Sequence, residues 1–153
     1  MKTMVSIRTV HTSADLHAVK CLFLEYGDTP GVGVCVVGFA GEIAALPAGY
    51  DLILLAEIDG VPIGCAALRQ LGGEAELKRL YVNPSARGSG AGRLLAESII
   101  EAARSRGYRL LRLDTLPSMV AAIRLYESLG FKPAEAYYAG APSDSRFYEL
   151  SLV

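Results

Sequence analysis

Residues 77–95 decide how this chain folds, and they read LKRLYVNPSARGSGAGRLL. The start of the stretch has the apolar pattern of a strand, which Pro84 ends because proline cannot donate a backbone hydrogen bond. Gly88, Gly90 and Gly92 leave the backbone unobstructed, so that successive N–H groups can converge on one point. The helix that follows adds its unpaired first N–H groups and the positive end of its dipole. The stretch therefore predicts an anion site, typically for phosphate or diphosphate.

The spacing of the glycines separates the known types of phosphate-binding loop. A Walker loop needs lysine and then Ser or Thr after its last glycine, whereas Arg93 and Leu94 follow here. A dinucleotide-binding loop needs Gly-x-Gly-x-x-Gly early in a βαβ unit, and this stretch has neither the spacing nor the position. What remains is Arg-x-x-Gly-x-Gly, from Arg87, Gly90 and Gly92. Alone, so short a motif also fits a glycine-rich turn beside a solvated arginine.

Length and composition narrow the class of protein. The chain has 153 residues, 52% of them hydrophobic, and a mean hydropathy of +0.32, which predicts one domain spanning 1–153 with a substantial core. A net charge of −1 and a pI near 6.1 argue against a nucleic-acid binder. No apolar run is long enough for a signal peptide or a membrane span. Cys21, Cys35 and Cys65 lack metal-ligand spacing, so we expect no metal and reduced thiols in a cytoplasmic protein.

Hydrophobic periodicity predicts the order of the elements. Strands are expected at 3–10, at 52–58 and 61–68 around an Asp59-Gly60 turn, at 74–82, and at 108–114 parallel to 74–82, with two more within 131–152. Helices are expected from Thr12 or Ser13 to about residue 26, from the glycine loop to about Arg106, and from Pro117 or Ser118 to Leu129. Between them, 34–37 resembles a strand and 41–46 a short helix.

Two segments give the chain its resemblance to the GNAT superfamily of N-acetyltransferases. One is Leu-x-Val-x-Pro at 80–84 followed by Arg-x-x-Gly-x-Gly at 87–92, and the other is Leu-Tyr-x-x-x-Gly-Phe at 125–131. The resemblance covers nearly the whole chain. It implies an α/β (α+β) fold: a mixed, mostly antiparallel sheet of six to seven strands flanked by helices, with a splayed parallel pair forming the acyl-CoA cleft. It also implies an acetyl-CoA-dependent N-acetyltransferase acting on a primary amine.

The resemblance also implies where acetyl-CoA binds. The free backbone of Val82 would pair with the pantetheine arm as an added strand would, while Arg87 and the loop amides would hold the diphosphate. The residues assigned to the cofactor are Leu80, Tyr81, Val82, Arg87, Gly88, Ser89, Gly90, Ala91, Gly92, Arg93, Thr115, Ser118, Met119, Ala122 and Tyr126. Many family members carry an asparagine three residues before Ala122. Met119 stands there in this chain, and Ser118 could replace the contact.

The candidates for the chemistry are a backbone amide and two side chains. The N–H near Leu80 would polarise the thioester carbonyl, where charge develops during attack. Tyr126 stands where the superfamily often places its general acid. A phenol with a pKa of about 10 donates uphill to a thiolate whose acid has a pKa of about 8.5, so a hydrogen bond to the sulfur is the safer role. Packing of the tyrosine ring on the sheet is the structural alternative.

A protonated amine must lose a proton before it attacks, which calls for a base or a water relay. Glu76 is the candidate base, because the strand period of two places it on the same face as Leu80. Glu74 is the alternative. The non-functional interpretation is a solvated carboxylate at a strand end.

The acceptor pocket is expected among the first helix, the segment 31–48 and the loop 137–146. Its candidate lining residues are Tyr26, Glu42, Tyr137, Tyr138 and Arg146. A small-molecule amine is the favoured partner, with a protein N-terminus or lysine as the alternative, and a non-catalytic acyl-CoA-binding module as a third interpretation. No nucleic acid or membrane is expected as a partner. If strand 147–152 is exposed at an edge, it could pair across a homodimer.

Overall fold

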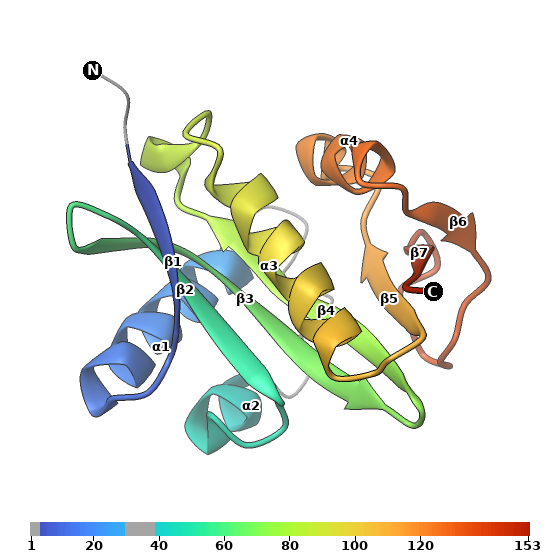
Figure 1. Ribbon diagram of the computed structural model, residues 1–153, viewed down its shortest axis with the longest axis horizontal. Helices are drawn as coiled ribbons and strands as arrows, with labels where there is room; N and C mark the ends of the chain where they lie inside the picture. Colours follow the sequence, from blue (N-terminus) through green and yellow to red (C-terminus); the bar gives the residue numbers. More distant parts are fainter. Residues whose placement is uncertain (1–3, 30–38) are drawn as a thin grey trace.

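The computed structural model describes residues 4–29 and 39–153, whose strands form one seven-stranded sheet in the order β1-β2-β3-β4-β5-β7-β6 (Figure 1). The strands are β1 (Val5–Thr9), β2 (Leu52–Ile58), β3 (Val61–Leu71), β4 (Glu74–Val82), β5 (Leu110–Thr115), β6 (Lys132–Ala134) and β7 (Arg146–Ser151). The helices are α1 (Ser13–Gly27), α2 (Phe39–Ala45), α3 (Ala91–Ser105) and α4 (Val120–Ser128), with a 3-10 turn η2 (Pro84–Ala86). Among these strands β4 and β5 run parallel and the other neighbours antiparallel. The predicted fold class is confirmed.

Local sequence explains where the first elements begin and turn. Thr12 caps α1: its hydroxyl accepts from the Asp15 N–H at 3.0 Å, and the Asp15 carboxylate accepts from the Thr12 N–H at 3.2 Å. This reciprocal capping box fixes the start of the helix. Asp59 and Gly60 both have positive φ, 51° and 76°, as a type I′ hairpin turn requires. The predicted cap and the predicted hairpin are both confirmed.

Helices cover both faces of the sheet (Figure 1). On one face α3 contributes Leu95 and Ile99, both fully buried, to a core shared with β3, β4 and β5. On the other face Val19 and Phe23 of α1 form a second core with residues of β2 and β3. Burial of these apolar side chains on each face stabilises the sheet between the helices.

The strands β4 and β5 separate almost as soon as they meet. Their parallel pairing consists of Ala75 with Leu111 and Glu76 with Arg112. Farther along β4, Arg79 and Leu80 together face one residue of β3, Ala66, which makes a β-bulge. Arg79 has a φ of 57° there. A bulge bends its strand and increases the local twist, so β4 turns away from β5 and a gap opens between them. The predicted splayed pair is confirmed.

The bulge overturns one prediction about β4. Strict alternation would place Glu76 and Leu80 on the same face. Instead Leu80 packs against the core under α3, together with Leu77, and Glu76 faces the opposite side, where it meets Arg69 of β3. The extra residue in the bulge shifts the alternation by one position, which reverses the face of every later side chain.

Several predicted boundaries also differ from the structure. The helix α4 begins at Val120 instead of Pro117 or Ser118, because Met119, at φ −87° and ψ 62°, is its non-helical N-cap. The helix α2 spans Phe39–Ala45 where 41–46 was predicted. The strand predicted at 34–37 lies outside the described residues.

The last strand is not the exposed edge that the homodimer prediction required. β7 pairs with β5 on one side and with β6 on the other. β6 covers the outer edge of β7 from Phe147 to Glu149, so over these residues β7 is not the free edge that pairing across a dimer requires. Within the described residues, no helix is long and apolar enough to cross a membrane.

Candidate active site

A cavity of about 750 Å³ lies where β4 ends and the helices α3 and α4 begin. This volume is within the usual range of ligand pockets, roughly 300–1,000 Å³. Its lining is Thr29, Leu80, Tyr81, Val82, Ala86, Arg87, Gly88, Gly90, Ala91, Gly92, Ser118, Met119, Val120, Ala121, Ala122 and Leu125. Most of the predicted cofactor residues are therefore brought together around one space.

The glycine loop has unpaired amides where it lines this cavity. The N–H groups of Ser89 and Ala91 donate to the Ala86 carbonyl at 3.2 Å and to the Ser89 hydroxyl at 3.3 Å. The N–H groups of Gly88, Gly90 and Gly92 have no acceptor among the described residues. Gly88 and Gly90 adopt φ of 86° and 89°, which glycine reaches without strain. These donors lie at the start of α3, where the helix dipole also favours negative charge.

A second helix begins at the same cavity. The N–H groups of Val120, Ala121 and Ala122 open α4 and likewise have no acceptor among the described residues. The first internal bond of the helix is Ile123 N–H to the Met119 carbonyl at 3.0 Å. The positive ends of α3 and α4 thus both face the large cavity, which favours a polyanionic ligand.

The end of β4 offers a free edge to this space. Asn83 donates its N–H to the Ile63 carbonyl of β3 at 2.7 Å. Because successive strand residues point their polar backbone groups to opposite sides, Val82 points its own toward the gap left by β5. The Val82 carbonyl accepts from Nε of Arg87 at 3.3 Å. That bond anchors the arginine at the cavity, next to the unpaired amides.

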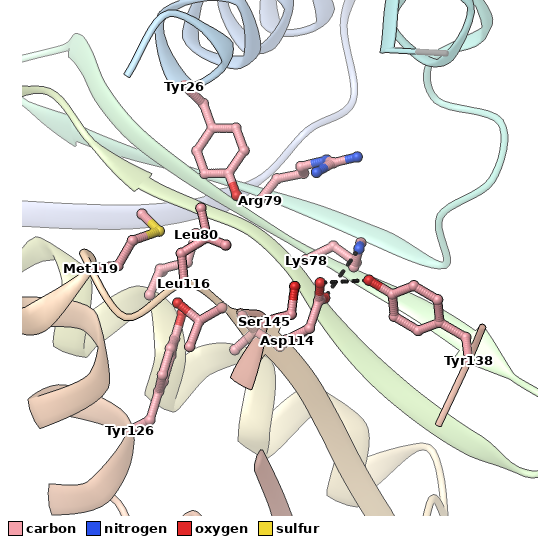
Figure 2. A pocket seen from close by; sticks show the side chains of 12 residues that line it. Tyr26, Lys78, Arg79, Leu80, Asp114, Leu116, Met119, Tyr126, Tyr138 and Ser145 are labelled. Carbon is pink, nitrogen blue, oxygen red and sulfur yellow. Dashed lines mark hydrogen bonds and ion pairs between the residues drawn. The ribbon is translucent and has the colours of Figure 1, made fainter. Parts of the chain in front are cut away.

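A smaller cavity of about 80 Å³ occupies the gap between β4 and β5 (Figure 2). It is lined by Tyr26, Leu77, Lys78, Arg79, Leu80, Asp114, Thr115, Leu116, Met119, Tyr126, Tyr138 and Ser145. Leu80 and Met119 line both cavities. The two cavities are therefore neighbours, with Leu80 of the β4 bulge and Met119 at the start of α4 in the walls of both.

Tyr126 presents its hydroxyl to the small cavity (Figure 2). The side chain is buried, and its ring lies edge-on to Phe131 with centroids 5.6 Å apart. No described residue hydrogen-bonds the hydroxyl. Burial, with a smaller contribution from the charge of Asp114, raises the pKa of Tyr126 well above its ordinary value. The phenol therefore stays protonated and can donate a hydrogen bond into the cavity.

Asp114 supplies a carboxylate to this cavity, and the sequence prediction missed it. Its Oδ1 lies 3.5 Å from Nζ of Lys78, and its Oδ2 accepts from the Tyr138 hydroxyl at 2.8 Å (Figure 2). Lys78 sits on β4 and Asp114 on β5, so the pair bridges the gap where the strands diverge. The available sequence signal was the position of Asp114 near the carboxyl end of an apolar strand, where the ligand sites of parallel strands form.

Glu76 lies outside both cavities. It is fully buried, and Arg69 donates to its Oε1 from Nη2 at 2.5 Å. The Tyr137 hydroxyl donates to its Oε2. Burial first, and then the charge of Glu76, raises the pKa of Tyr137, so the phenol keeps its proton for this bond. Glu76 therefore holds the loop before β7 against the sheet.

The other predicted residues either line one of the cavities or hydrogen-bond to neighbouring elements. Tyr26, Tyr138 and Thr115 line the small cavity. The Ser89 hydroxyl accepts from the Ala91 N–H at the start of α3, Arg93 donates to the Ser128 hydroxyl at 2.6 Å, and Glu42 binds Arg79 with Oε1 2.8 Å from Nη2. Arg146, Tyr137 and Glu42 line neither cavity. The lining residues that the prediction missed are Leu77, Lys78, Arg79, Asp114, Leu116 and Ser145 in the small cavity and Thr29, Ala86, Val120, Ala121 and Leu125 in the large one.

Comparison with known proteins identifies this arrangement. The family model for the Acetyltransferase (GNAT) family matches residues 14–131. The chain belongs to the GNAT family. An uncharacterized N-acetyltransferase of Schizosaccharomyces pombe is 37% identical to this GNAT protein over 142 residues, which is 88% of this chain and 86% of the relative. This GNAT protein is thus an acyltransferase, with acetyl-CoA as its cofactor.

Two solved structures extend the comparison. The protein yncA of Salmonella typhimurium, solved with its cofactor acetyl-CoA, superposes with a TM-score of 0.76 at 26% identity, over 97% of this chain and 94% of that one. The ribosomal-protein-S18-alanine N-acetyltransferase of Escherichia coli gives 0.73 at 27% identity over the same shares. In this GNAT protein the unpaired amides of the glycine loop and the size of the large cavity fit acetyl-CoA.

Proposed function

We propose that this GNAT acetyltransferase acetylates the primary amine of a small molecule. The observation that carries the proposal is the small cavity of about 80 Å³, which is lined by Asp114 and shares Leu80 and Met119 with the lining of the large cavity. For comparison, a cavity of roughly 150 Å³ accommodates benzene. The reacting end of the acceptor must therefore be narrower than an aromatic ring, as an aminomethyl group is.

The cofactor supplies an acetyl group activated as a thioester. The amides of Gly88, Gly90 and Gly92, with the Arg87 guanidinium beside them, would bind its diphosphate through charge-assisted hydrogen bonds. The open edge of Val82 would pair with the pantetheine amides. These contacts use backbone groups, so they depend on the path of the chain more than on side-chain identity.

The bulge takes Leu80 out of the hydrogen-bonded register of the sheet. Among the described residues, neither β3 nor β5 pairs with Leu80 in the strand register. Its N–H would point at the thioester carbonyl and stabilise the negative charge that develops on the oxygen when the amine attacks. Tyr126 would donate its hydrogen bond to the departing sulfur, the role that its raised pKa favours over full proton transfer.

The amine must give up a proton as it attacks, and we assign Asp114 as the acceptor of that proton. Within residues 4–29 and 39–153, Oδ1 of Asp114 pairs with Lys78 and Oδ2 accepts from Tyr138, and a carboxylate oxygen can accept two hydrogen bonds. The predicted base, Glu76, lies outside the cavity and binds Arg69 and Tyr137. Lys78 and Tyr138 would hold the Asp114 carboxylate toward the acceptor.

A second candidate acceptor is the amino terminus of a protein. One solved relative, 27% identical, is a ribosomal-protein-S18-alanine N-acetyltransferase. An N-terminal amino group on a small residue would also be narrow enough for the small cavity.

We infer a cytoplasmic location for either activity, because Cys21 and Cys65 are free thiols.

The test is the release of free thiol from acetyl-CoA with a panel of amines, with products identified by mass spectrometry. The panel contains amino acids, polyamines and short peptides with free N-termini. We expect turnover with a small amine and about tenfold weaker CoA binding in Arg87→Glu, since the reversed charge opposes the diphosphate. Turnover with peptides alone would show that the acceptor is a protein terminus. Unchanged CoA affinity in Arg87→Glu would contradict the assigned diphosphate site.

A further inference from the structure

Met119 occupies the junction between the two cavities. It lines both of them, together with Leu80 of the β4 bulge. Figure 2 shows the thioether side chain directed toward Leu80, and Tyr126 is part of the same small cavity's lining. A group that extends from the large cavity toward the small one would therefore contact these two side chains.

The backbone of Met119 is fixed although its side chain is adaptable. Its N–H donates to the Leu116 carbonyl at 2.9 Å, and its carbonyl accepts from the Ile123 N–H at 3.0 Å. Met119 thus caps α4 and cannot withdraw without disturbing the helix start. The unbranched thioether has several rotatable bonds and fills irregular space. The Met119 side chain can therefore change rotamer while its backbone stays fixed.

We propose that Met119 sets the length of the acyl group that this protein accepts from its acyl-CoA donor. The proposal rests on the proposed function, in which the donor lies in the large cavity and its acyl group reaches the junction. An acetyl group ends there. A longer chain must enter the small cavity of about 80 Å³ and compete with the Met119 side chain for that space. Removing the side chain beyond Cβ would open the junction.

The experiment measures binding of CoA, acetyl-CoA, propionyl-CoA and butyryl-CoA by isothermal titration calorimetry, in the absence of an amine. We expect wild-type affinity to fall from acetyl to butyryl. In Met119→Ala the ratio of butyryl to acetyl affinity should rise by about tenfold or more, because one added methylene in a tight pocket typically changes binding by roughly 10-fold to 200-fold. Met119→Leu conserves volume and should keep the wild-type ratio.

Val120→Ala is the matched control, because Val120 lines the large cavity and is not part of the small cavity's lining. This variant should change the affinities for all four ligands by the same factor. An unchanged ratio in Met119→Ala, or the same change of ratio in Val120→Ala, would overturn the proposal. Failure of CoA itself to bind the folded wild-type protein would overturn the proposed function instead, so the two failures are distinguishable. Thermal melts of each variant confirm that it is folded.

Discussion

At the scale of single residues, the half-buried Asp114 and the buried Glu76 show how two carboxylates on neighbouring strands take different parts. Asp114 faces the small cavity, while Glu76 is enclosed by Arg69 and Tyr137. We expect Asp114→Asn to lower kcat/KM by about 100-fold at neutral pH, within the range for loss of a general base. Activity should partly recover at high pH, where more of the amine arrives deprotonated. The measurement is a pH profile of kcat/KM with one active amine.

Glu76→Gln is the comparison variant. It leaves the Arg69 guanidinium without its charged partner, so we expect a lower melting temperature. Its kcat/KM should fall by less than about tenfold, without recovery at high pH, because removing a general base typically costs roughly 100-fold or more. If Glu76→Gln instead loses activity and regains it at high pH while Asp114→Asn remains active, Glu76 is the base and the assignment of Asp114 is wrong.

Tyr126 gives a second prediction at this scale. Its hydroxyl has no partner among the described residues, so Tyr126→Phe removes no hydrogen bond to that part of the chain, and we expect an unchanged melting temperature. The lost donor to the departing sulfur should lower kcat by about 10-fold to 100-fold while the KM for acetyl-CoA stays similar. Because burial raises the pKa of Tyr126, deprotonation of the phenol should not limit activity below pH 10. A Tyr126→Phe enzyme with wild-type kcat would show that the ring is structural.

At the scale of elements, the turn from η2 into α3 depends on the left-handed φ of 89° at Gly90. A side chain there is strained, so Gly90→Ala should lower the free energy of unfolding by roughly 1 kcal/mol and weaken CoA binding as the amides turn away. Gly92→Ala is the control. An added Cβ at Gly92 would meet the Leu125 and Val82 side chains at the ordinary contact distances of 3.7 and 3.8 Å. Chemical denaturation and calorimetry compare the two variants, and equal losses in both would contradict this account of the loop.

The sequence predicted those elements whose start or end depends on one residue type. Thr12 caps α1, Asp59-Gly60 makes the hairpin turn, and Gly107, at φ 85°, follows α3. The sequence did not predict the β4 bulge, because neither Arg79 nor Leu80 is a typical turn residue. The register shift also depends on the facing strand β3, which periodicity along β4 does not describe. The start of α4 was also placed too early. A helix whose N-cap is Met119, without a side-chain cap, has no sequence signal for its first turn.

These two differences also decide which predicted site residues line a cavity. Most of the residues assigned to the cofactor line the large cavity, because the glycine spacing determines the backbone path of the loop. Fewer of the residues assigned to the acceptor line the small cavity, because the bulge changes which side chains of β4 face the gap. Lys78 and Asp114 come within 3.5 Å of each other only through the pairing of distant strands. Periodicity along one strand carries no information about that contact.

At the scale of the whole molecule, the sheet has a seam between β4 and β5. On one side lie β1 to β4 with α1, α2 and α3, and on the other β5, β6 and β7 with α4 (Figure 1). The strands across the seam pair at Ala75–Leu111 and Glu76–Arg112. The large cavity has one wall on each side, with Val82 and Gly90 opposite Ser118 and Ala122. A ligand in that cavity therefore connects the two sides.

This arrangement predicts that CoA stabilises both sides together. At 100 times its Kd, a ligand that binds the native state alone adds about 2.7 kcal/mol to the free energy of unfolding. For a chain of this size, that corresponds to a rise in melting temperature of roughly 5–10 °C. Hydrogen exchange should slow at the glycine loop and also at the first turn of α4, since unpaired amides of both helices face the cavity. Arg87→Glu should weaken both effects at the same CoA concentration. Protection confined to the glycine loop would mean that CoA binds only the β1 to β4 side of the molecule. In that case the cofactor would not position α4, with Met119 and Tyr126.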